Sequence, residues 1–217
     1  MKILVLGDSH SVVFSYANTQ SDCKHIFDVC PVGGASARGL VNNSSHSNAL
    51  NIYKEKILQT DLDTVILQVG ECDLGIIIWY FVLNNIEVLP LAIDNTVSRL
   101  MLFADLELKG KFKQIIICGS NLPTTADSVD RNLMEPGRNH DIDIRTRTQV
   151  THEYNKKLKH LCELRGYDFL DITAGTINTE TGLIQDKFLH WDQANSHMDI
   201  EAVYDVYMSE LNKILNQ

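Results

Sequence analysis

The sequence predicts an α/β fold, in which one parallel sheet of about five strands has helices on both of its faces. β-rich segments alternate along the chain with segments of helical periodicity, which is typical of βαβ units. Three of the β-rich segments are nearly continuous apolar runs, as expected of strands that are covered on both faces. The chain has 217 residues and shows no shift of composition that would mark a boundary. We therefore expect residues 1–217 to form a single domain with one core.

The expected strands are short and apolar. The first, third and fourth contain the runs ILVL, VILQV and IIIC, whereas the fifth has a weaker pattern. Aliphatic and β-branched residues dominate these runs and suit buried strands. The five segments are Lys2–Leu6, His25–Cys30, Thr64–Val69, Gln114–Cys118 and Tyr167–Asp171.

Helical periodicity follows most of the strands. Pro90 suits the start of the second helix, because proline is tolerated in a first helical turn. Asp199 suits the N-cap of the last helix, because its carboxylate can accept a free backbone N–H. The predicted helices are Ser47–Leu58, Leu91–Leu108, Asp143–Arg165 and Ile200–Leu215.

Three connecting segments have less regular patterns. The segment Ser120–Asp141 is polar and contains Pro123 and Pro136, which predicts a long loop of the kind that often serves as a lid or binding loop. The segment Thr173–Leu183 predicts a turn or hairpin. The apolar run Ile76–Leu83 predicts a buried segment packed on the sheet. The alternative for this run is an acyl pocket or an exposed dimer face.

Composition and charge argue against several function classes. The formal net charge is −9 and no run of Lys or Arg interrupts it, so neither nucleic acid nor an anionic membrane is expected as the main partner. The longest uncharged apolar run, Leu74–Leu83, is half of the ~20 residues that a membrane-spanning helix needs. The run Ile3–Leu6 has no cleavage site after it and predicts a strand rather than a signal peptide. Five scattered cysteines without a CxxC pair indicate reduced thiols, and we expect a soluble, cytoplasmic protein.

The turn after the first strand carries the first candidate for chemistry. Ser9 lies at the carboxyl edge of a buried strand, where its hydroxyl could act as a nucleophile and its backbone N–H could bind an oxyanion. A simple N-cap is the alternative for this serine. Asp8 and His10 also match the first ligand pair of a binuclear metallophosphatase. The Gly-Asp and Gly-Asn-His clusters that such enzymes also need do not occur in the sequence. We therefore expect no metal or other cofactor, and we take His10 as a substrate-binding or oxyanion-binding candidate.

Two further strand exits carry candidate residues. Gly33 and Gly34 follow the second strand, where a glycine permits positive φ and exposes a backbone N–H to an oxyanion. A tight turn into a helix is the alternative for this pair. Glu71 and Asp73 follow the third strand, and their carboxylates could hold active-site backbone or orient a substrate hydroxyl. Local turn capping is the alternative for Asp73.

The candidate general base lies just before the last helix. His197 precedes the expected N-cap by two residues, so the helix would hold its ring at the edge of the sheet. Asp192 or Asn195 would fix the tautomer of this ring by accepting its Nδ1–H. His190, with Asp186 or Asp192 as its partner, is the rival base. Either histidine could also be an ordinary residue of a surface loop.

The order of these features resembles the SGNH (GDSL-type) hydrolase superfamily, whose members are esterases and deacylases on a three-layer, flavodoxin-like sheet. The resemblance spans nearly the whole chain. The segments GDSHS, GGASARGLVNNS and VGECDLGIIIWY are similar to a bacterial subgroup that tends to occur with sugar-polymer genes. Gly7-Asp8-Ser9 resembles the first sequence block, Gly34 the second-block glycine, Gly70-Glu71-Cys72-Asp73 the third block Gly-x-Asn-Asp, and His197-Met198-Asp199 the final His-Pro-Asn.

The resemblance implies hydrolysis of an acyl ester through an acyl-serine intermediate on Ser9. His197, rather than His190, then acts as general base and afterwards as general acid. The backbone N–H groups of Ser9 and Gly34 are the implied oxyanion donors.

Two departures from the family pattern concern the oxyanion hole and the acid. Cys72 stands where the third block has asparagine, so the usual side-chain donor is missing. Loss of one such donor costs about 2.7–4 kcal/mol of transition-state stabilisation, unless a backbone N–H or an amide such as Gln68 or Asn42 replaces it. Ala194 stands where the final block has aspartate, so Asp192 or Asn195 would have to orient the histidine.

The substrate implied by the resemblance is a small ester, such as an O-acylated saccharide. Glu71, Asp73, Arg38 and the loop Ser120–Asp141 would bind its polar groups. The same site could transfer the acyl group to a sugar hydroxyl instead of water. A non-catalytic saccharide-binding protein on the same fold is the third possibility, which the two departures motivate. No oligomeric state follows from the sequence.

Overall fold

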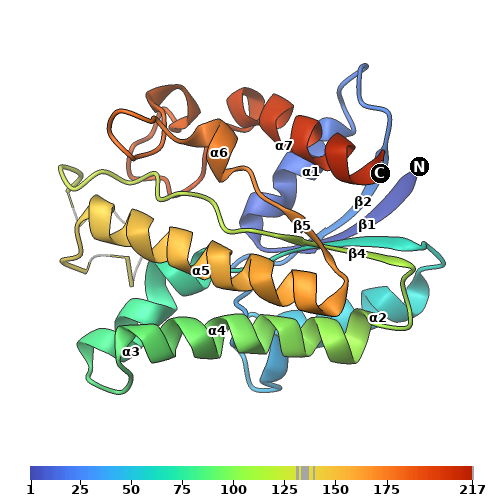
Figure 1. Cartoon of the computed structure of the whole chain (residues 1–217), viewed down its shortest axis with the longest axis horizontal. Coiled ribbons are helices and arrows are strands. Elements are labelled where there is room, and N and C mark those ends of the chain that lie inside the picture. Colours follow the sequence, from blue (N-terminus) through green and yellow to red (C-terminus); the bar gives the residue numbers. More distant parts are fainter. Residues whose placement is uncertain (131, 133–136, 139, 217) are drawn as a thin grey trace.

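One parallel sheet of five strands forms the centre of the protein (Figure 1). The computed structural model describes residues 1–130, 132, 137–138 and 140–216. The strands are β1 (Lys2–Gly7), β2 (Ile26–Pro31), β3 (Thr64–Gln68), β4 (Gln114–Cys118) and β5 (Asp168–Leu170). They lie in the order β2-β1-β3-β4-β5, and every neighbouring pair is parallel. This is the flavodoxin-like order, and the predicted α/β fold class is confirmed.

Helices cover both faces of the sheet, as predicted (Figure 1). α1 (Val12–Ala17) and α7 (Ile200–Leu215) pack together on one face. α2 (Ala49–Gln59), α4 (Leu89–Phe103) and α5 (Ile144–Arg165) cover the other face. Two short helices complete the set, α3 (Ile78–Leu83) and α6 (Thr173–Thr176).

Alternate side chains of β1 enter two different cores. Leu4 and Leu6 lie in the core shared with α2, α4 and α5, whereas Ile3 and Val5 lie in the core shared with α1 and α7. All four side chains are fully buried. Since successive side chains of a strand point to opposite faces, a strand covered on both sides needs an uninterrupted apolar run. The ILVL run of the sequence is explained by this arrangement.

Carboxylates cap two of the predicted helices at their N-termini. Asp143 Oδ1 accepts from Thr146 N at 2.9 Å at the start of α5. Asp199 Oδ1 accepts from Ala202 N at 3.0 Å at the start of α7, as the sequence predicts. Each cap pairs one of the free N–H groups of a first helical turn. The second cap also fixes where the loop before α7 ends.

Two predicted segments differ in detail from the structure. The helix predicted for Leu91–Leu108 is α-helical as far as Phe103 and then forms a π-helical turn to Leu108. The run Ile76–Leu83 forms the end of another π-helical turn followed by α3. Only one side of α3 faces the core, so the side chain of Trp79 is buried whereas that of Tyr80 is 59% exposed. The predicted buried segment is therefore buried only in part, with Tyr80 and Leu83 exposed.

The two predicted irregular segments contain little regular structure where the structure describes them. Thr173–Leu183 begins with α6 and continues into a turn, which an antiparallel bridge between Ile177 and Ile184 closes. In the predicted loop Ser120–Asp141, residues 120–130 form neither helix nor strand. Pro136 and residues 131, 133–135 and 139 of this predicted loop lie outside the described residues.

The described residues contain no helix with the length and hydropathy needed to cross a bilayer. All five cysteines are free thiols.

Hydrogen bonds join the end of β1 to strand β3 and to helix α2. Asp8 N donates to Gln68 O at 2.9 Å, so the pairing of β1 with β3 extends into the following turn. Tyr53 of α2 donates its hydroxyl to Gly7 O at 2.7 Å. A Cβ at Gly7 would lie 2.4 Å from Ser11 Cβ and 2.9 Å from Gln68 O. Glycine is therefore required where the chain turns from the strand into the site.

Replacement of Tyr53 by Phe is expected to lower the free energy of unfolding by about 1 kcal/mol, the net value of one buried hydrogen bond. The loss stays this small because Gly7 O also accepts from Val32 N at 2.8 Å and keeps a partner. Urea denaturation of the two proteins measures the difference. Tyr80→Phe is the matched control, because this tyrosine is exposed, and it should leave the unfolding midpoint unchanged. An equal loss in both variants would contradict the role assigned to Tyr53.

Candidate active site

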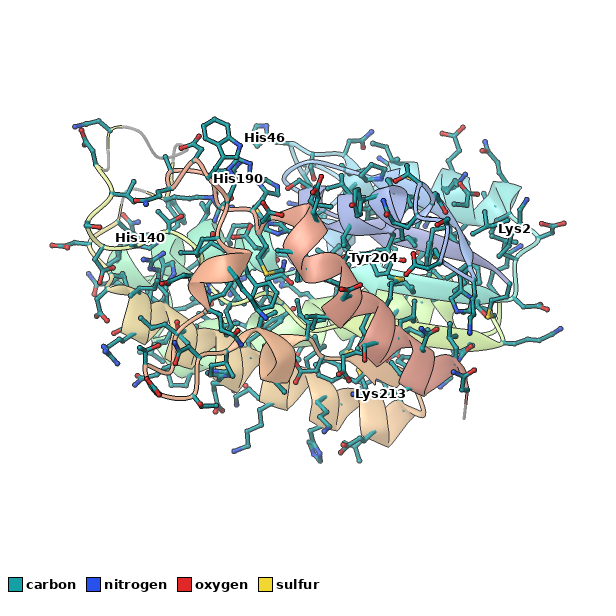
Figure 2. All side chains as sticks on the ribbon, turned by 90° about the horizontal axis from the view of Figure 1, so that it is seen from above. Lys2, His46, His140, His190, Tyr204 and Lys213 are labelled. Atoms are coloured by element: carbon teal, nitrogen blue, oxygen red, sulfur yellow. The ribbon has the colours of Figure 1, made fainter. Side chains whose placement is uncertain are left out.

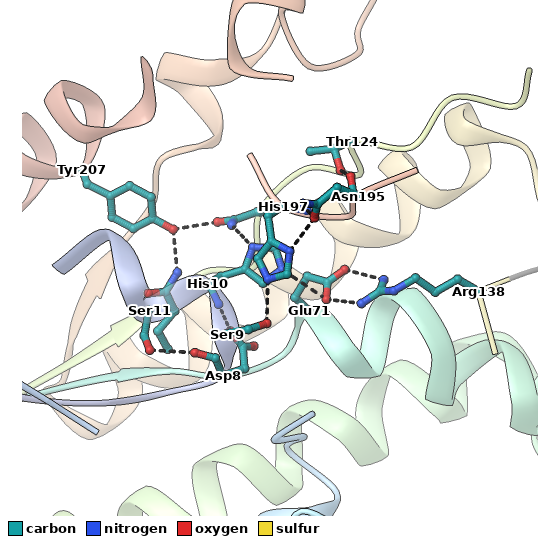
Figure 3. A network of polar contacts seen from close by, with 12 residues as sticks. Asp8, Ser9, His10, Ser11, Glu71, Thr124, Arg138, Asn195, His197 and Tyr207 are labelled. Carbon is teal, nitrogen blue, oxygen red and sulfur yellow. Dashed lines mark hydrogen bonds and ion pairs between the residues drawn. The ribbon is translucent and has the colours of Figure 1, made fainter. Parts of the chain in front are cut away.

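Ser9 lies at the carboxyl edge of the sheet, at the first position of a 3₁₀ turn that leads into α1. Asp8 caps this turn, since its Oδ1 accepts from His10 N at 3.0 Å. Ser11 Oγ donates to Asp8 O at 2.7 Å and closes the turn from the other side. Burial raises the pKa of Asp8 to about 6. The N-cap role that was the alternative for Ser9 thus belongs to Asp8, and the hydroxyl of Ser9 faces His197 (Figure 3).

His197 contacts Ser9 directly. Its Nε2 lies 2.8 Å from Ser9 Oγ, and its Nδ1 lies 2.7 Å from Asn195 Oδ1 (Figure 3). The same Asn195 oxygen accepts from His197 N at 3.0 Å, which fixes the oxygen rather than the nitrogen of the amide toward the ring. Nδ1 therefore carries the proton, and Nε2 is the acceptor that a hydroxyl nucleophile needs.

The loop that carries these residues is anchored at both ends. Leu189 and Met198 form an antiparallel bridge, and Asp199 N donates to Phe188 O at 2.9 Å. Thr124, from the loop after β4, adds a long hydrogen bond of 3.5 Å to Asn195 O. Together with the Asp199 cap of α7, these contacts fix the position of His197 next to the turn that follows β1.

Asp192 and His190, the other predicted partners, lie elsewhere in this loop. The side chain of Asp192 is exposed, and its Oδ1 accepts from Ala194 N at 3.1 Å. Its backbone N donates to His190 Nδ1 at 3.1 Å. Asp192 therefore caps a local turn. The amide of Asn195, and not the carboxylate of Asp192, contacts Nδ1 of His197. Of the two alternatives for the orienting residue, the structure brings only Asn195 into contact.

Asp73 holds the turn after β2 instead of facing open space. It is fully buried, and its two oxygens accept from Ala37 N at 2.6 Å and from Arg38 N at 3.4 Å. Burial raises the pKa of this carboxyl to about 7. Because both oxygens face backbone amides of the second turn, the prediction that Asp73 orients a substrate hydroxyl does not fit this arrangement. The alternative of holding active-site backbone does.

Gly34 is one of the predicted oxyanion donors, and Cys72 stands where the family pattern has its side-chain donor. Gly34 has a φ of +71° and lies exposed in the turn after β2, a backbone conformation that favours glycine. Burial raises the pKa of the Cys72 thiol to about 12, so this side chain is neutral and is at most a weak S–H donor. Gln68, a predicted substitute, donates its Nε2 to Tyr207 at 2.6 Å and is thus already engaged.

Glu71 forms the centre of a buried charged cluster. Arg138 donates to both of its oxygens, at 2.7 Å and 2.6 Å, and His10 Nε2 lies 3.4 Å from its Oε2 (Figure 3). These contacts hold the pKa of Glu71 far below its usual range, against the opposing effect of burial. Since the carboxylate is bound by Arg138, the predicted contact of Glu71 with substrate would have to occur beside this ion pair.

His10 stacks on the catalytic candidate. The ring centroids of His10 and His197 are 4.3 Å apart, and the planes differ by 19°. The Asn121 amide lies 3.0 Å from His10 Nδ1, and Tyr207 OH lies 2.8 Å from the same amide. Both ring nitrogens of His10 thus face protein groups. The prediction that His10 binds substrate or oxyanion does not fit this geometry, which instead makes it a support for the His197 ring.

The charge of His10 depends on its neighbours. Burial alone would lower its pKa, but the Glu71 hydrogen bond and the charges of Glu71 and Asp8 outweigh burial and the charge of Arg138, and they raise it. Asn121 Nδ2 faces His10 Nδ1, and Asn121 Oδ1 accepts from Tyr207 OH. When Nδ1 is protonated, the amide must turn over so that its oxygen faces the ring. The described residues contain no group of three or more His, Cys, Asp or Glu that could hold a metal ion.

Arg138, Asn121 and Tyr207 were missed in the sequence. Arg138 lies in the polar loop after β4, and Asn121 lies three residues beyond the end of β4. Asn121 carries a usable signal, since polar residues at a strand exit often belong to the site of such a sheet. Tyr207 lies on the buried face of α7 and has the pattern of an ordinary core residue.

Several proteins with solved structures share this fold. No family model and no curated protein matches the sequence. A solved GDSL-like lipase from Bacteroides thetaiotaomicron has a TM-score of 0.66 at 13% identity, over 99% of this chain and 87% of its own. A member of the lipolytic G-D-S-L family from Veillonella parvula has a TM-score of 0.60 at 15% identity, over 100% and 99% of the two chains. An acetyl xylan esterase has a TM-score of 0.58 at 11% identity, over 99% and 100%. The chain therefore has the fold of GDSL-type and SGNH-type hydrolases.

Replacement of His10 by Gln is expected to move the acid limb of any pH–rate profile for this site to higher pH. The raised pKa of His10 keeps it cationic at mildly acid pH, and a cation 4.3 Å away disfavours protonation of His197 by about 1 kcal/mol even at water-like screening. Asp8, Glu71 and Arg138 stay in the variant.

The measurement is kcat/KM for an aryl ester between pH 4.5 and 8. His160→Gln is the control, because His160 lies exposed on α5, and it should leave the limb in place. A limb that stays unchanged in His10→Gln would show that His10 is neutral over this range.

Proposed function

We propose that this protein is a serine hydrolase that cleaves an acyl ester through an acyl-serine intermediate. The observation that carries this proposal is that His197 contacts Ser9 through one ring nitrogen, at 2.8 Å, and Asn195 through the other, at 2.7 Å. A nucleophile bonded to a base, with a third group that orients the base, is the arrangement that nucleophilic catalysis uses. The fold shared with a GDSL-like lipase and an acetyl xylan esterase supports the same class of reaction.

The first half-reaction transfers the acyl group to the enzyme. Ser9 Oγ attacks the ester carbonyl carbon while its proton passes to His197 Nε2. The oxyanion accepts from the backbone N–H groups of Ser9 and Gly34, with the neutral Cys72 thiol as a weak third donor. The bond between the carbonyl carbon and the alcohol oxygen then breaks, and His197 returns the proton to that oxygen.

The second half-reaction releases the acid. His197 takes a proton from a water molecule, whose oxygen attacks the carbonyl carbon of acyl-Ser9. The bond between this carbon and Ser9 Oγ then breaks, and the proton returns to Ser9. The products are one alcohol and one carboxylic acid, and the balance needs no cofactor.

An O-acylated saccharide is the substrate class that we propose for this reaction. A wide groove of about 720 Å³ runs past Gly34. Its walls carry the hydroxyls of Ser36 and Ser44 and the aromatic ring of Phe81, and Arg38 stacks its guanidinium on that ring at 4.3 Å. Hydroxyls and a partly exposed ring suit a polyhydroxylated alcohol better than a lipid. The likeness to an acetyl xylan esterase supports the same choice.

We further propose a reducing compartment such as the cytoplasm for this enzyme. All five of its cysteines are free thiols, and free thiols are typical of proteins that work in reducing conditions.

Replacement of Ser9 by Ala is expected to lower kcat for 4-nitrophenyl acetate by about 10⁴-fold or more, because the attacking oxygen is removed. A fluorophosphonate probe should label the native protein once, at Ser9, and should fail to label the variant. Ser15→Ala on the exposed side of α1 is the matched control and should retain both labelling and turnover. Undiminished turnover by pure Ser9→Ala protein would exclude Ser9 as the nucleophile.

Replacement of Asn195 by Ala is expected to lower kcat by roughly 10- to 100-fold, because His197 loses the acceptor that fixes its tautomer. Asn195→Asp keeps an oxygen at that place and should retain most of the rate. Asp192→Ala should change the rate by less than about threefold, since its carboxylate caps only Ala194 N and a turn cap acts on stability. Steady-state kinetics of the three variants, with melting temperatures as a check on folding, decides between the two orienting residues. A larger loss in Asp192→Ala than in Asn195→Ala would reverse the assignment.

A further inference from the structure

The hydrogen bonds at the two nitrogens of His197 leave its ring free to tilt. Nε2 lies 2.8 Å from Ser9 Oγ, and Nδ1 lies 2.7 Å from Asn195 Oδ1. A ring held at two atoms can still rotate about the line that joins them. The ring of His10 lies against one face of His197, with centroids 4.3 Å apart and planes 19° apart, and limits this rotation. The alignment of the base therefore depends on what holds His10.

His10 is also held at both of its ring nitrogens. Its Nδ1 lies 3.0 Å from the amide of Asn121, which belongs to the loop after β4. Its Nε2 lies 3.4 Å from Oε2 of Glu71, which belongs to the turn after β3. The second distance is longer than an ordinary hydrogen bond. A stronger contact must therefore fix the position of the Glu71 carboxylate.

Arg138 makes this stronger contact (Figure 3). Its Nη1 and Nη2 donate to the two oxygens of Glu71, at 2.7 Å and 2.6 Å. A bidentate pair fixes the orientation of a carboxylate as well as its position. The side chains of Arg138 and Glu71 are only 13% and 17% exposed, so water competes little for either. A continuous series of contacts thus runs from Arg138 through Glu71 and His10 to His197.

A glycine in the helical turn after β3 leaves room for this arginine. Asp73–Ile77 is a π-helical turn, and Gly75 lies at its centre. A Cβ at Gly75 would overlap Nη1 of Arg138 and would lie 3.1 Å from Oε1 of Glu71. Gly75 does not have a positive φ, so space rather than backbone conformation explains a glycine at this position.

His140, near Arg138 in the chain, packs on the same turn. Its Nε2 lies 3.0 Å from Gly75 O, and its ring centroid lies 5.6 Å from that of Trp79. Figure 2 shows His140 at the end of the molecule opposite Lys2, the first residue of β1. This is the carboxyl end of the strands, where the candidate active site lies. The loop after β4 is thus joined to the turn after β3 beside the site.

We propose that Arg138 is a positioning residue of the active site. It holds Glu71 against His10 and thereby sets the alignment of the His197 ring. The inference rests on the proposed function, because it assumes that His197 takes the proton of Ser9. It adds a role for the loop after β4, which contributes to the rate of the chemical step through Arg138 without contact between this arginine and the reacting atoms.

Replacement of Arg138 by Gln is expected to lower kcat for 4-nitrophenyl acetate by about 10- to 100-fold, because small displacements of a catalytic group are costly. KM should change by less than about twofold, since the lost contact acts on the chemical step and not on substrate binding. The second-order rate of fluorophosphonate labelling at Ser9 should fall by a factor similar to that of kcat. The amount of label at completion gives the active fraction, so that misfolded protein does not alter kcat.

Arg165→Gln is the matched control for this variant. Arg165, the last residue of α5, also donates to a carboxylate, that of Asp105, at 2.8 Å. Its replacement should lower the melting temperature and leave kcat per labelled serine unchanged. The same behaviour in Arg138→Gln would show a role in stability alone and would overturn the inference.

A double-mutant cycle with His10→Gln tests the series of contacts. In the His10→Gln protein, Arg138→Gln should lower kcat further by less than about twofold, because residues that act through one another have non-additive effects. An undiminished loss in that background would show that Arg138 acts by another route. A rise in KM that accounts for the whole effect would show direct binding of substrate. Either result would overturn the inference.

Replacement of Gly75 by Ala tests the same contact without removal of the arginine. The added Cβ should displace the guanidinium of Arg138, so kcat per labelled serine should fall by a factor similar to that of Arg138→Gln. In a protein that already carries Arg138→Gln, it should have little further effect. Losses that multiply in the double variant would contradict the role assigned to this glycine and to the ion pair.

The label at Ser9 separates a failure of the inference from a failure of the proposed function. Unchanged kcat in the Arg138 variant leaves the proposed function intact, provided that the ester is cleaved and Ser9 is labelled in the native protein. Absence of both cleavage and labelling in the native protein would instead refute the proposed function, and the inference with it.

Discussion

The hydrogen bond between Ser9 and His197 joins two turns that are 188 residues apart in the chain, and the site depends on it. The parallel sheet makes this contact possible, because α1 leaves β1 on the same face on which α7 packs. Phe14 of α1 contacts Tyr207 of α7 edge-on, with ring centroids 5.6 Å apart. The geometry of the polar site is thus set by the apolar packing of two helices.

The site combines a neutral orienting group with a charged second layer. Asn195 supplies an acceptor to His197 but no negative charge, whereas the usual carboxylate of a triad also stabilises the imidazolium. Glu71 supplies a carboxylate one ring further away, beyond His10, and Arg138 compensates it. The negative charge that the sequence block lacks at position 194 is therefore present on another loop, but it acts through a stacked ring instead of a direct hydrogen bond.

The sheet and the strand exits could be predicted, because apolar periodicity and the order of strands and helices are local signals. The choice of His197 over His190 as the partner of Ser9 rested instead on the resemblance to the SGNH pattern. Arg138 could not be predicted, because it is selected by a contact with Glu71 across 67 residues and leaves no periodic pattern. The choice of Asn195 over Asp192 depends on loop conformation. Asn195 Oδ1 caps the backbone N of the residue two positions ahead, which is the usual geometry of an Asx turn. Asp192 makes the same cap with Ala194 N, so this local pattern does not distinguish the two residues.

Binding energy has a larger role in such a site than in an enzyme with a complete set of catalytic groups. In the proposed reaction, the neutral thiol of Cys72 would give the oxyanion a weak donor in place of an amide, and one lost donor costs about 2.7–4 kcal/mol. Contacts with remote parts of a substrate can offset that loss only when they become stronger in the transition state. The groove at Gly34 that we propose for the saccharide would provide such contacts. Small activated esters do not fill this groove, so their turnover measures the chemistry of Ser9 and His197 without the contribution of specificity.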